Sequence, residues 1–403
     1  MRAIDDGASS TTPAVVESGT IGRELWTADV AYAGIGSALG GAGVAVQRRP
    51  DGGRTIVALD ALDRLRRRFP DAPTVEHRAV LAPPAVNAHT HLDLSDMPFT
   101  PGPYGAFIAE VIAFSHAGRR GEAATRRGLA ELRAARTTTV GDIVTTEEGM
   151  RILLDAPDID GVAYWEVLAP DPERSEEVLA ATERAIDRFS SWQRQGGVRV
   201  GLSPHAPHTV SPRLMVGLTA LARRRGLPMQ IHVAESEGEQ TLHRRGDGPL
   251  ATALAALGAS WAPSGRSPIG YLEDLGVLEA RPTLVHMVHV DEDDVRAVAR
   301  AGSAVVHCPR SNEALGCGTF PWALFARHGV SVGLGTDSRG SSPDLDVRRE
   351  WLAALRLHGD GANAAQLVWS AVKGGARALG TRPRAARRGE PLDALSSWTL
   401  PVH

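Results

Sequence analysis

The chain has 403 residues, of which 43% are hydrophobic and 23% are charged. It is long enough to bury a large core, and its composition is not that of a disordered protein. The net charge is −3 and basic residues are interspersed with acidic ones, which excludes the polybasic surface typical of nucleic-acid or membrane binding. We therefore expect a small-molecule substrate and neither nucleic acid nor membrane as a partner. The oligomeric state stays open, a homodimer included.

The two cysteines, Cys308 and Cys317, are too few for a disulfide framework or a cysteine zinc site. Residues 1–15 lack the apolar core of a secretion signal, and no segment approaches the ~20 apolar residues that span a bilayer. We therefore expect a cytoplasmic protein.

The first part of the chain predicts short strands separated by turns, at about residues 25–46, 55–59 and 77–81. The segment 384–403 is punctuated by Pro and Gly, and we expect it to rejoin these strands. The predicted division is thus a small β-sandwich subdomain of residues 1–83 and 384–403, and a catalytic domain of residues 84–383.

After residue 84, short apolar runs alternate with amphipathic segments. A first strand ends near His89, and further strands are expected at 138–144, 161–168, 198–203, 228–233, 282–288, 303–307 and 330–335. Helices are expected at 123–135, 172–195, 212–225, 272–278, 291–301, 322–328, 346–357 and 362–379. Strand and helix alternate as in a distorted (β/α)8 TIM barrel, an α/β fold whose chemistry lies at the carboxyl ends of the strands.

Histidines gather at those strand ends. In a strand, residues i and i+2 point to the same side, so His89 and His91 can reach one metal ion, although such a pair also arises by chance. A lone histidine after a strand is more often a turn residue, and Asp337 in Gly-Thr-Asp-Ser is more often a helix N-cap. Eight of the 14 histidines nevertheless follow the apolar runs: His89, His91, His205, His208, His232, His286, His289 and His307. Their joint occurrence favours a metal site. The others, His243 among them, are given no role.

Six motifs, taken in order, resemble the amidohydrolase superfamily, specifically its mononuclear-metal aminohydrolases, which include S-adenosylhomocysteine, guanine and aminodeoxyfutalosine deaminases and triazine chlorohydrolases. The motifs are at 87–93, 203–211, 232–235, 286–290, 307–312 and 335–338. The resemblance implies that the metal ligands are His89, His91, His232 and Asp337. It also implies that Glu235 and His286 handle protons and that His205 contacts the substrate. The family often has an aromatic residue three positions after this histidine, whereas this chain has His208. The side of the substrate pocket formed by this residue is therefore expected to be more polar.

These roles are chemically coherent. Three neutral imidazoles and a carboxylate leave a divalent metal with residual positive charge and an open position, which brings the pKa of bound water toward neutrality and supplies hydroxide. Glu235 can carry a proton to the ring nitrogen and later to the departing amine, Asp337 can take the proton of the water, and His286 can hold the hydroxyl group. Zinc is the expected metal and iron the alternative, because imidazole and carboxylate suit both.

A single metal is expected. Binuclear members of the family use a carboxylated lysine at the end of a middle strand, and the only lysine, Lys373, follows Asp337 in the chain. A bridging Glu166 is the alternative.

The runs at 89–95 and 307–312 look most like those of aminodeoxyfutalosine deaminases. This implies attack at C6 of an adenine-type nucleoside with a benzoate tail, release of ammonia, and a place in menaquinone biosynthesis. Arg310 either pairs with that carboxylate or braces a loop. Phe99, Tyr104 and Phe107 either form an apolar lid over the substrate ring or serve only in packing. Asp93 and Ser95 either support the metal ligands or cap the next helix. The alternatives are an aminohydrolase or chlorohydrolase acting on S-adenosylhomocysteine, guanine, cytosine or a triazine, and a non-catalytic scaffold of the same fold.

Overall fold

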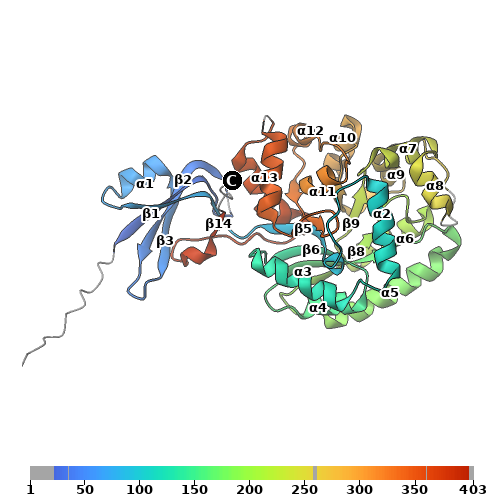
Figure 1. Ribbon diagram of the computed structural model, residues 1–403, viewed down its shortest axis with the longest axis horizontal. Helices are drawn as coiled ribbons and strands as arrows, with labels where there is room; N and C mark the ends of the chain where they lie inside the picture. The colour runs from blue at the N-terminus through green and yellow to red at the C-terminus, as the bar shows by residue number, and fades with distance from the viewer. Residues whose placement is uncertain (1–21, 35, 257–260, 360, 399–403) are drawn as a thin grey trace, which may run out of the picture.

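The computed structural model describes residues 22–34, 36–256, 261–359 and 361–398. The predicted lack of a signal core falls on residues 1–15 and lies outside the described residues. Figure 1 shows two parts side by side, a sheet with one helix and a larger assembly in which helices surround parallel strands. Among the described residues, no helix combines the length and apolar character that a membrane crossing requires.

The smaller part is one five-stranded sheet, in the order β14-β4-β1-β2-β3. Its strands are β1 (Arg23–Ala31), β2 (Leu39–Arg48), β3 (Arg54–Ala61), β4 (Thr74–Ala82) and β14 (Ser396–Trp398). The C-terminal segment rejoins the early strands as predicted, because β14 pairs antiparallel with β4.

The predicted β-sandwich is not shown, because the described residues of this part form a single sheet. Helix α1 (Leu62–Arg68) packs Leu65, together with Phe69, against Leu25 and Ala45 of the sheet. A second apolar cluster joins sheet residues to Ala386 and Leu395 of the C-terminal segment. A helix and an irregular segment thus supply the apolar contacts that a second sheet would make in a sandwich.

The larger part has parallel strands in two sheets, in the orders β13-β5-β6-β7-β8 and β12-β11-β10-β9. The strands are β5 (Val86–His91), β6 (Thr139–Val144), β7 (Asp160–Val167), β8 (Arg199–Pro204), β9 (Gln230–Val233), β10 (Thr283–His286), β11 (Val305–His307), β12 (Val332–Leu334) and β13 (Asp337–Ser338). Leu202 and Met229 form a parallel bridge between the sheets. At the other junction, the Thr336 N–H donates to the His89 carbonyl (3.0 Å). The predicted parallel order of strands is confirmed.

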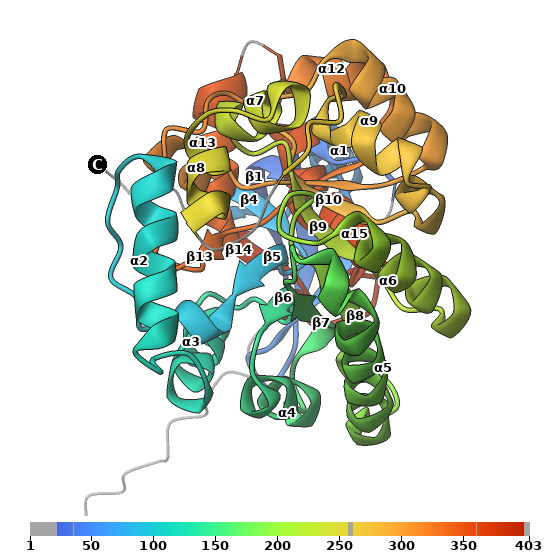
Figure 2. The ribbon, with the colours of Figure 1, turned by 90° about the vertical axis from the view of Figure 1, so that its right-hand side faces the viewer.

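Helices surround these strands (Figure 2). The α-helices are α2 (Tyr104–His116), α3 (Glu122–Ala134), α4 (Glu147–Asp155), α5 (Ser175–Trp192), α6 (Pro212–Arg225), α7 (Glu237–Arg245), α8 (Pro249–Ala256), α9 (Pro268–Asp274), α10 (Glu292–Ala301), α11 (Pro309–Ala314), α12 (Trp322–Arg327), α13 (Val347–His358), α14 (Ala364–Trp369) and α15 (Gly375–Ala378). Short helical turns are η1 (Leu92–Leu94), η2 (Pro172–Arg174), η3 (Val277–Ala280), η4 (Ser370–Gly374) and η5 (Leu392–Ala394).

Capping residues fix where the helices next to the strand ends begin and stop. Ser211 accepts a hydrogen bond from the Leu214 N–H at the start of α6, and Ser236 accepts one from the Glu239 N–H at the start of α7. Gly246 ends α7 with a φ of 75°, a left-handed conformation that glycine adopts without a steric penalty. The loops after β8 and β9 therefore end at defined residues.

Gly335 is expected to be a position where even a methyl group destabilises the fold. A Cβ there would lie 2.9 Å from both the Cβ and the carbonyl oxygen of His89. Gly335→Ala should lower the free energy of unfolding by about 1–3 kcal/mol, because the strands must separate to admit it. Urea unfolding measures this. The matched control is Gly102→Ala, where a Cβ meets no atom within 4 Å, and equal unfolding midpoints for the two variants would contradict the close approach.

Candidate active site

Four side chains from three strands bring ligand atoms to one point. His89 and His91 come from β5, His232 from β9 and Asp337 from β13. Asp337 Oδ1 lies 3.4 Å from Nε2 of His89 and 3.4 Å from Nε2 of His91, and Nε2 of His91 lies 3.2 Å from Nε2 of His232. Ligands about 2.0–2.1 Å from a tetrahedral zinc ion are separated by about 3.4 Å. The structure therefore brings together all four residues that the sequence analysis selected as ligands.

In two of these histidines, the second ring nitrogen has a hydrogen-bond partner. His89 Nδ1–H donates to Gln230 Oε1 (2.7 Å), and His232 Nδ1–H donates to the carbonyl oxygen of His205 (3.0 Å). The lone pair of each ring is then on Nε2 and faces the centre. Within the described part of the chain, the buried Nε2 of His89 has no hydrogen-bond partner. An unpaired imidazole nitrogen beside a carboxylate fits a divalent metal ion.

Asp337 is held by two hydroxyl groups. Its Oδ2 accepts hydrogen bonds from Ser311 Oγ (2.7 Å) and Ser341 Oγ (2.8 Å), which leaves Oδ1 to the histidines. Burial raises the pKa of Asp337, but the close approach of His89 and the charges of the nearby histidines outweigh burial and hold the pKa well below its ordinary value. Asp337 is therefore a carboxylate at neutral pH, which is its ligand form.

Burial, followed by the charge of neighbouring His89, holds the pKa of His91 well below its ordinary value, and the same two causes act on His232. Both imidazoles are therefore neutral at pH 7, as metal ligands must be. The backbone here is strained, with φ of 59° at Asp337 and 73° at His286. Left-handed conformations of non-glycine residues cluster at functional sites.

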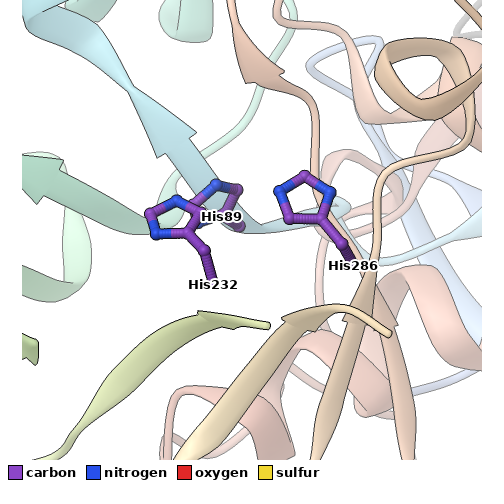
Figure 3. Close-up of side chains that lie close together, drawn as sticks. All are labelled: His89, His232 and His286. Carbon is purple, nitrogen blue, oxygen red and sulfur yellow. The ribbon is translucent and has the colours of Figure 1, made fainter. Parts of the chain in front are cut away.

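Glu235 and His286 lie beside the ligand group. His286 Nε2 is 3.6 Å from Glu235 Oε1, and His286 Nδ1–H donates to Asn312 Oδ1 (2.9 Å). Figure 3 shows the rings of His286, His89 and His232 gathered around a common space. Burial, and next the charge of Asp337, raise the pKa of Glu235 to about 8. A carboxyl group that binds and releases its proton near neutral pH suits general acid–base chemistry.

Two further side chains lie against this group. His205 donates or accepts a hydrogen bond with Thr209 Oγ1 (2.8 Å), and its ring centroid is 4.9 Å from that of His232. Ligand atoms of Glu166, His205 and His232 lie within 4.8 Å of one another. Burial raises the pKa of Glu166 to about 7. The structure thus places Glu166, the alternative bridging residue, next to the site.

Arg310 is engaged by acidic neighbours. Its Nε donates to Glu350 Oε1 (2.6 Å), and its Nη1 and Nη2 donate to Asp344 (3.1 and 2.9 Å). This geometry favours the loop-bracing alternative, because a substrate carboxylate would have to displace one of these partners. Phe107 packs near Leu94 and Phe114 in a small apolar cluster, and its predicted contact with the substrate stays a prediction.

Several residues of the site were not predicted from the sequence: Gln230, Ser311, Asn312 and Ser341, which orient the side chains described above, and Arg120. Arg120 lies between two acidic groups, with Nη1 3.9 Å from Glu166 Oε2 and Nε 3.8 Å from Asp93 Oδ1. For Tyr104, expected in a lid or in packing, burial and next the charge of Glu235 hold the pKa of the hydroxyl group well above its ordinary value. Ser311 and Asn312 lie in the motif at 307–312, which could have pointed to them, whereas no spacing in the sequence marks Gln230, Ser341 or Arg120.

Gln230→Leu is expected to lower metal affinity by about 10- to 100-fold, because it removes the acceptor that orients His89. Competition with a chromophoric chelator measures the affinity. Gln47→Leu, in strand β2, is the matched control and should bind metal as the unaltered protein does. Equal affinities for the two variants would show that Gln230 does not orient a ligand.

The fold and the cluster of three histidines with Asp337 suit a hydrolase with a metal site, and the comparison with known proteins shows the family. The chain belongs to the Amidohydrolase family, which it matches over residues 80–385. An aminodeoxyfutalosine deaminase of Deinococcus radiodurans is 44% identical to it over 405 residues, which cover 98% of this chain and 94% of that protein. The predicted family is confirmed.

Solved structures share the fold. Aminofutalosine deaminase of Helicobacter pylori, in complex with methylthio-coformycin, superposes with a TM-score of 0.73 at 21% identity, over 94% of this chain and 92% of that chain. An adenosine deaminase of Xanthomonas campestris with bound zinc gives a TM-score of 0.65 at 25% identity, over 91% of this chain and 82% of that chain.

Proposed function

We propose that the chain is a metal-dependent hydrolytic deaminase of an adenine-type nucleoside, with 6-aminodeoxyfutalosine as its substrate in menaquinone biosynthesis. The observation that carries the proposal is the convergence of Nε2 of His91, Nε2 of His232 and Asp337 Oδ1, with Glu235 beside them. The 44% identity to a deaminase of that substrate, over nearly the whole chain, supports the choice of substrate.

His89, His91, His232 and Asp337 would hold one divalent ion in this site. When bound, such an ion lowers the pKa of water and so provides a nucleophile at neutral pH. Zinc is the expected ion, since two or three imidazoles and a carboxylate form a frequent zinc site, and iron is the alternative. Glu166 as a bridge to a second ion in the same site is the alternative to a mononuclear centre.

The residues around the ligands have distinct tasks. Asp337 accepts the proton of the attacking water, and His286 holds the entering oxygen through its free Nε2. Glu235 delivers its proton to the ring nitrogen beside C6, takes up the proton of the new hydroxyl group and passes it to the departing amine. The proton held by Asp337 then restores Glu235, so that the ring gains an oxygen and ammonia leaves. His205 contacts the ring from the side of β8. Contacts of His208, Phe107 and Arg310 with the substrate remain predictions.

A substrate panel tests the proposal. We expect the release of ammonia from 6-aminodeoxyfutalosine to have a higher kcat/KM than that from adenosine, S-adenosylhomocysteine or methylthioadenosine. A higher value for one of the last three would move the assignment to that substrate. Turnover of guanine, cytosine or a chlorotriazine alone would favour the other hydrolytic reactions, and a folded, metal-free protein inactive on all of them would favour the scaffold alternative.

We also propose that the two parallel sheets form one distorted (β/α)8 barrel. The Leu202–Met229 bridge and the hydrogen bond from Thr336 to His89 support this. The proposed catalytic domain is residues 84–383, and the proposed subdomain is residues 1–83 and 384–403, of which 1–21 and 399–403 lie outside the described residues. The two cysteines are free and buried, which supports a reducing cytoplasm.

A further inference from the structure

A second group of ligand-type side chains lies outside the four proposed metal ligands. It consists of His208, in the loop after β8, and of Glu239 and His243 on α7. Their ligand atoms all lie within 4.8 Å of one another, and His208 Nδ1 is 3.9 Å from Glu239 Oε1. The three residues are 7%, 2% and 0% exposed, respectively. Two imidazoles and a carboxylate are thus enclosed together in the interior.

The helix supplies two of these side chains in register. Glu239 and His243 are four residues apart on α7, so they project from the same face, one turn apart. His208 faces them from the loop after β8.

These side chains lack hydrogen-bond partners for several buried atoms. Within residues 22–34, 36–256, 261–359 and 361–398, no partner exists for His208 Nδ1, Glu239 Oε1 or either ring nitrogen of His243. A buried polar atom without a partner destabilises the folded state, so four such atoms in one place indicate a bound ligand. The rings of Trp261 and Tyr271, with centroids 4.7 and 5.0 Å from that of His243, enclose the group on another side.

Burial also sets the protonation states. It lowers the pKa of His208 and of His243 to about 3, so both imidazoles are neutral and keep a lone pair. Burial raises the pKa of Glu239 to about 8. A bound cation would replace the proton of this carboxyl group and neutralise its buried charge.

We propose that His208, Glu239 and His243 hold a second divalent metal ion of the zinc type, separate from the ion of the catalytic site. A set of two histidines and one glutamate is a known zinc ligand set that leaves a position for water. Glu239 also connects this ion to the catalytic loop, because its Oε2 accepts a hydrogen bond from the Glu235 N–H (3.0 Å). The second ion therefore fixes the backbone of the residue that handles protons.

Metal content tests the proposal independently of activity. The protein is equilibrated with micromolar zinc and dialysed against metal-free buffer, and zinc per chain is measured by mass spectrometry. We expect two equivalents in the unaltered protein and one in His243→Leu. His208→Phe, which replaces the imidazole by an apolar ring, should also hold one equivalent and decides the question if His243→Leu does not fold.

Glu166→Gln is the matched control, because Glu166 belongs to the group nearest the catalytic ligands. This variant should keep two equivalents. A single equivalent in the unaltered protein would overturn the proposal. A second equivalent that survives in both His243→Leu and His208→Phe would also overturn it. So would a second equivalent that disappears in Glu166→Gln, because the second ion would then lie beside the first one in the catalytic site.

Discussion

Glu235→Gln is expected to lower kcat for the deamination by about 10²- to 10⁴-fold, the range typical of a lost general acid–base group. The amide has the size of the carboxyl group but cannot transfer a proton to the ring nitrogen or to the amine. KM should change little, because Glu235 acts on the reacting atoms. Steady-state ammonia release with 6-aminodeoxyfutalosine measures both constants.

The interpretation of Glu235→Gln requires that the metal ion stays bound. Glu235 is not among the four proposed ligands, so zinc per chain should match that of the unaltered protein. Glu237→Gln, the same substitution at an exposed residue of α7, is the matched control and should retain normal turnover. Near-normal kcat in Glu235→Gln would show that another group transfers the proton.

The ligand set could be predicted from the sequence because its geometry depends on local rules. Side chains alternate along a strand, so His89 and His91 share a side, and the ends of parallel strands meet at one edge of the sheet. These rules bring His232 and Asp337 to the same place without any knowledge of packing. The apolar runs that mark the strands are equally local, and the parallel order followed from them.

The residues that orient the ligands could not be predicted. Gln230 is 141 positions from His89, and Ser311 is 26 positions from Asp337. Glutamine and serine are common, and although Ser311 lies in the motif at 307–312, nothing in the spacing of either residue indicates its contact. Their role arises only when the strands pack, and the same holds for His208 and His243, which lie on separate elements.

Two other predictions depended on tertiary contacts. Arg310 suits an anionic substrate as an isolated residue, but Asp344 and Glu350, 34 and 40 positions later, surround its guanidinium group. The charged segment 60–69 predicts a loop or a short helix, and α1 lies there. Leu65 of this helix packs against the sheet, a contact that the sandwich prediction assigned to a second sheet.

His232→Ala is expected to remove the catalytic ion and with it the turnover. The substitution deletes one of four ligand atoms, so metal affinity should fall by more than the about 10- to 100-fold expected when only an orienting residue is lost. Zinc per chain, measured after dialysis against metal-free buffer, should decrease by one equivalent relative to the unaltered protein. Ammonia release should fall to the level of the chelator-treated enzyme.

The loss of the His232 imidazole can be distinguished from misfolding by measuring how much the metal ion stabilises the folded protein. An ion that binds only the folded chain stabilises it by RT ln(1 + [L]/Kd), about 2.7 kcal/mol when its free concentration is 100 times Kd. Zinc added to the metal-free protein should therefore raise the melting temperature less in His232→Ala than in the unaltered chain. His116→Ala, at an exposed histidine of α2, should behave as the unaltered chain does. A His232→Ala protein that keeps all its zinc and its turnover would show that the ion is held elsewhere, since the imidazole that lies 3.2 Å from His91 Nε2 would then be dispensable.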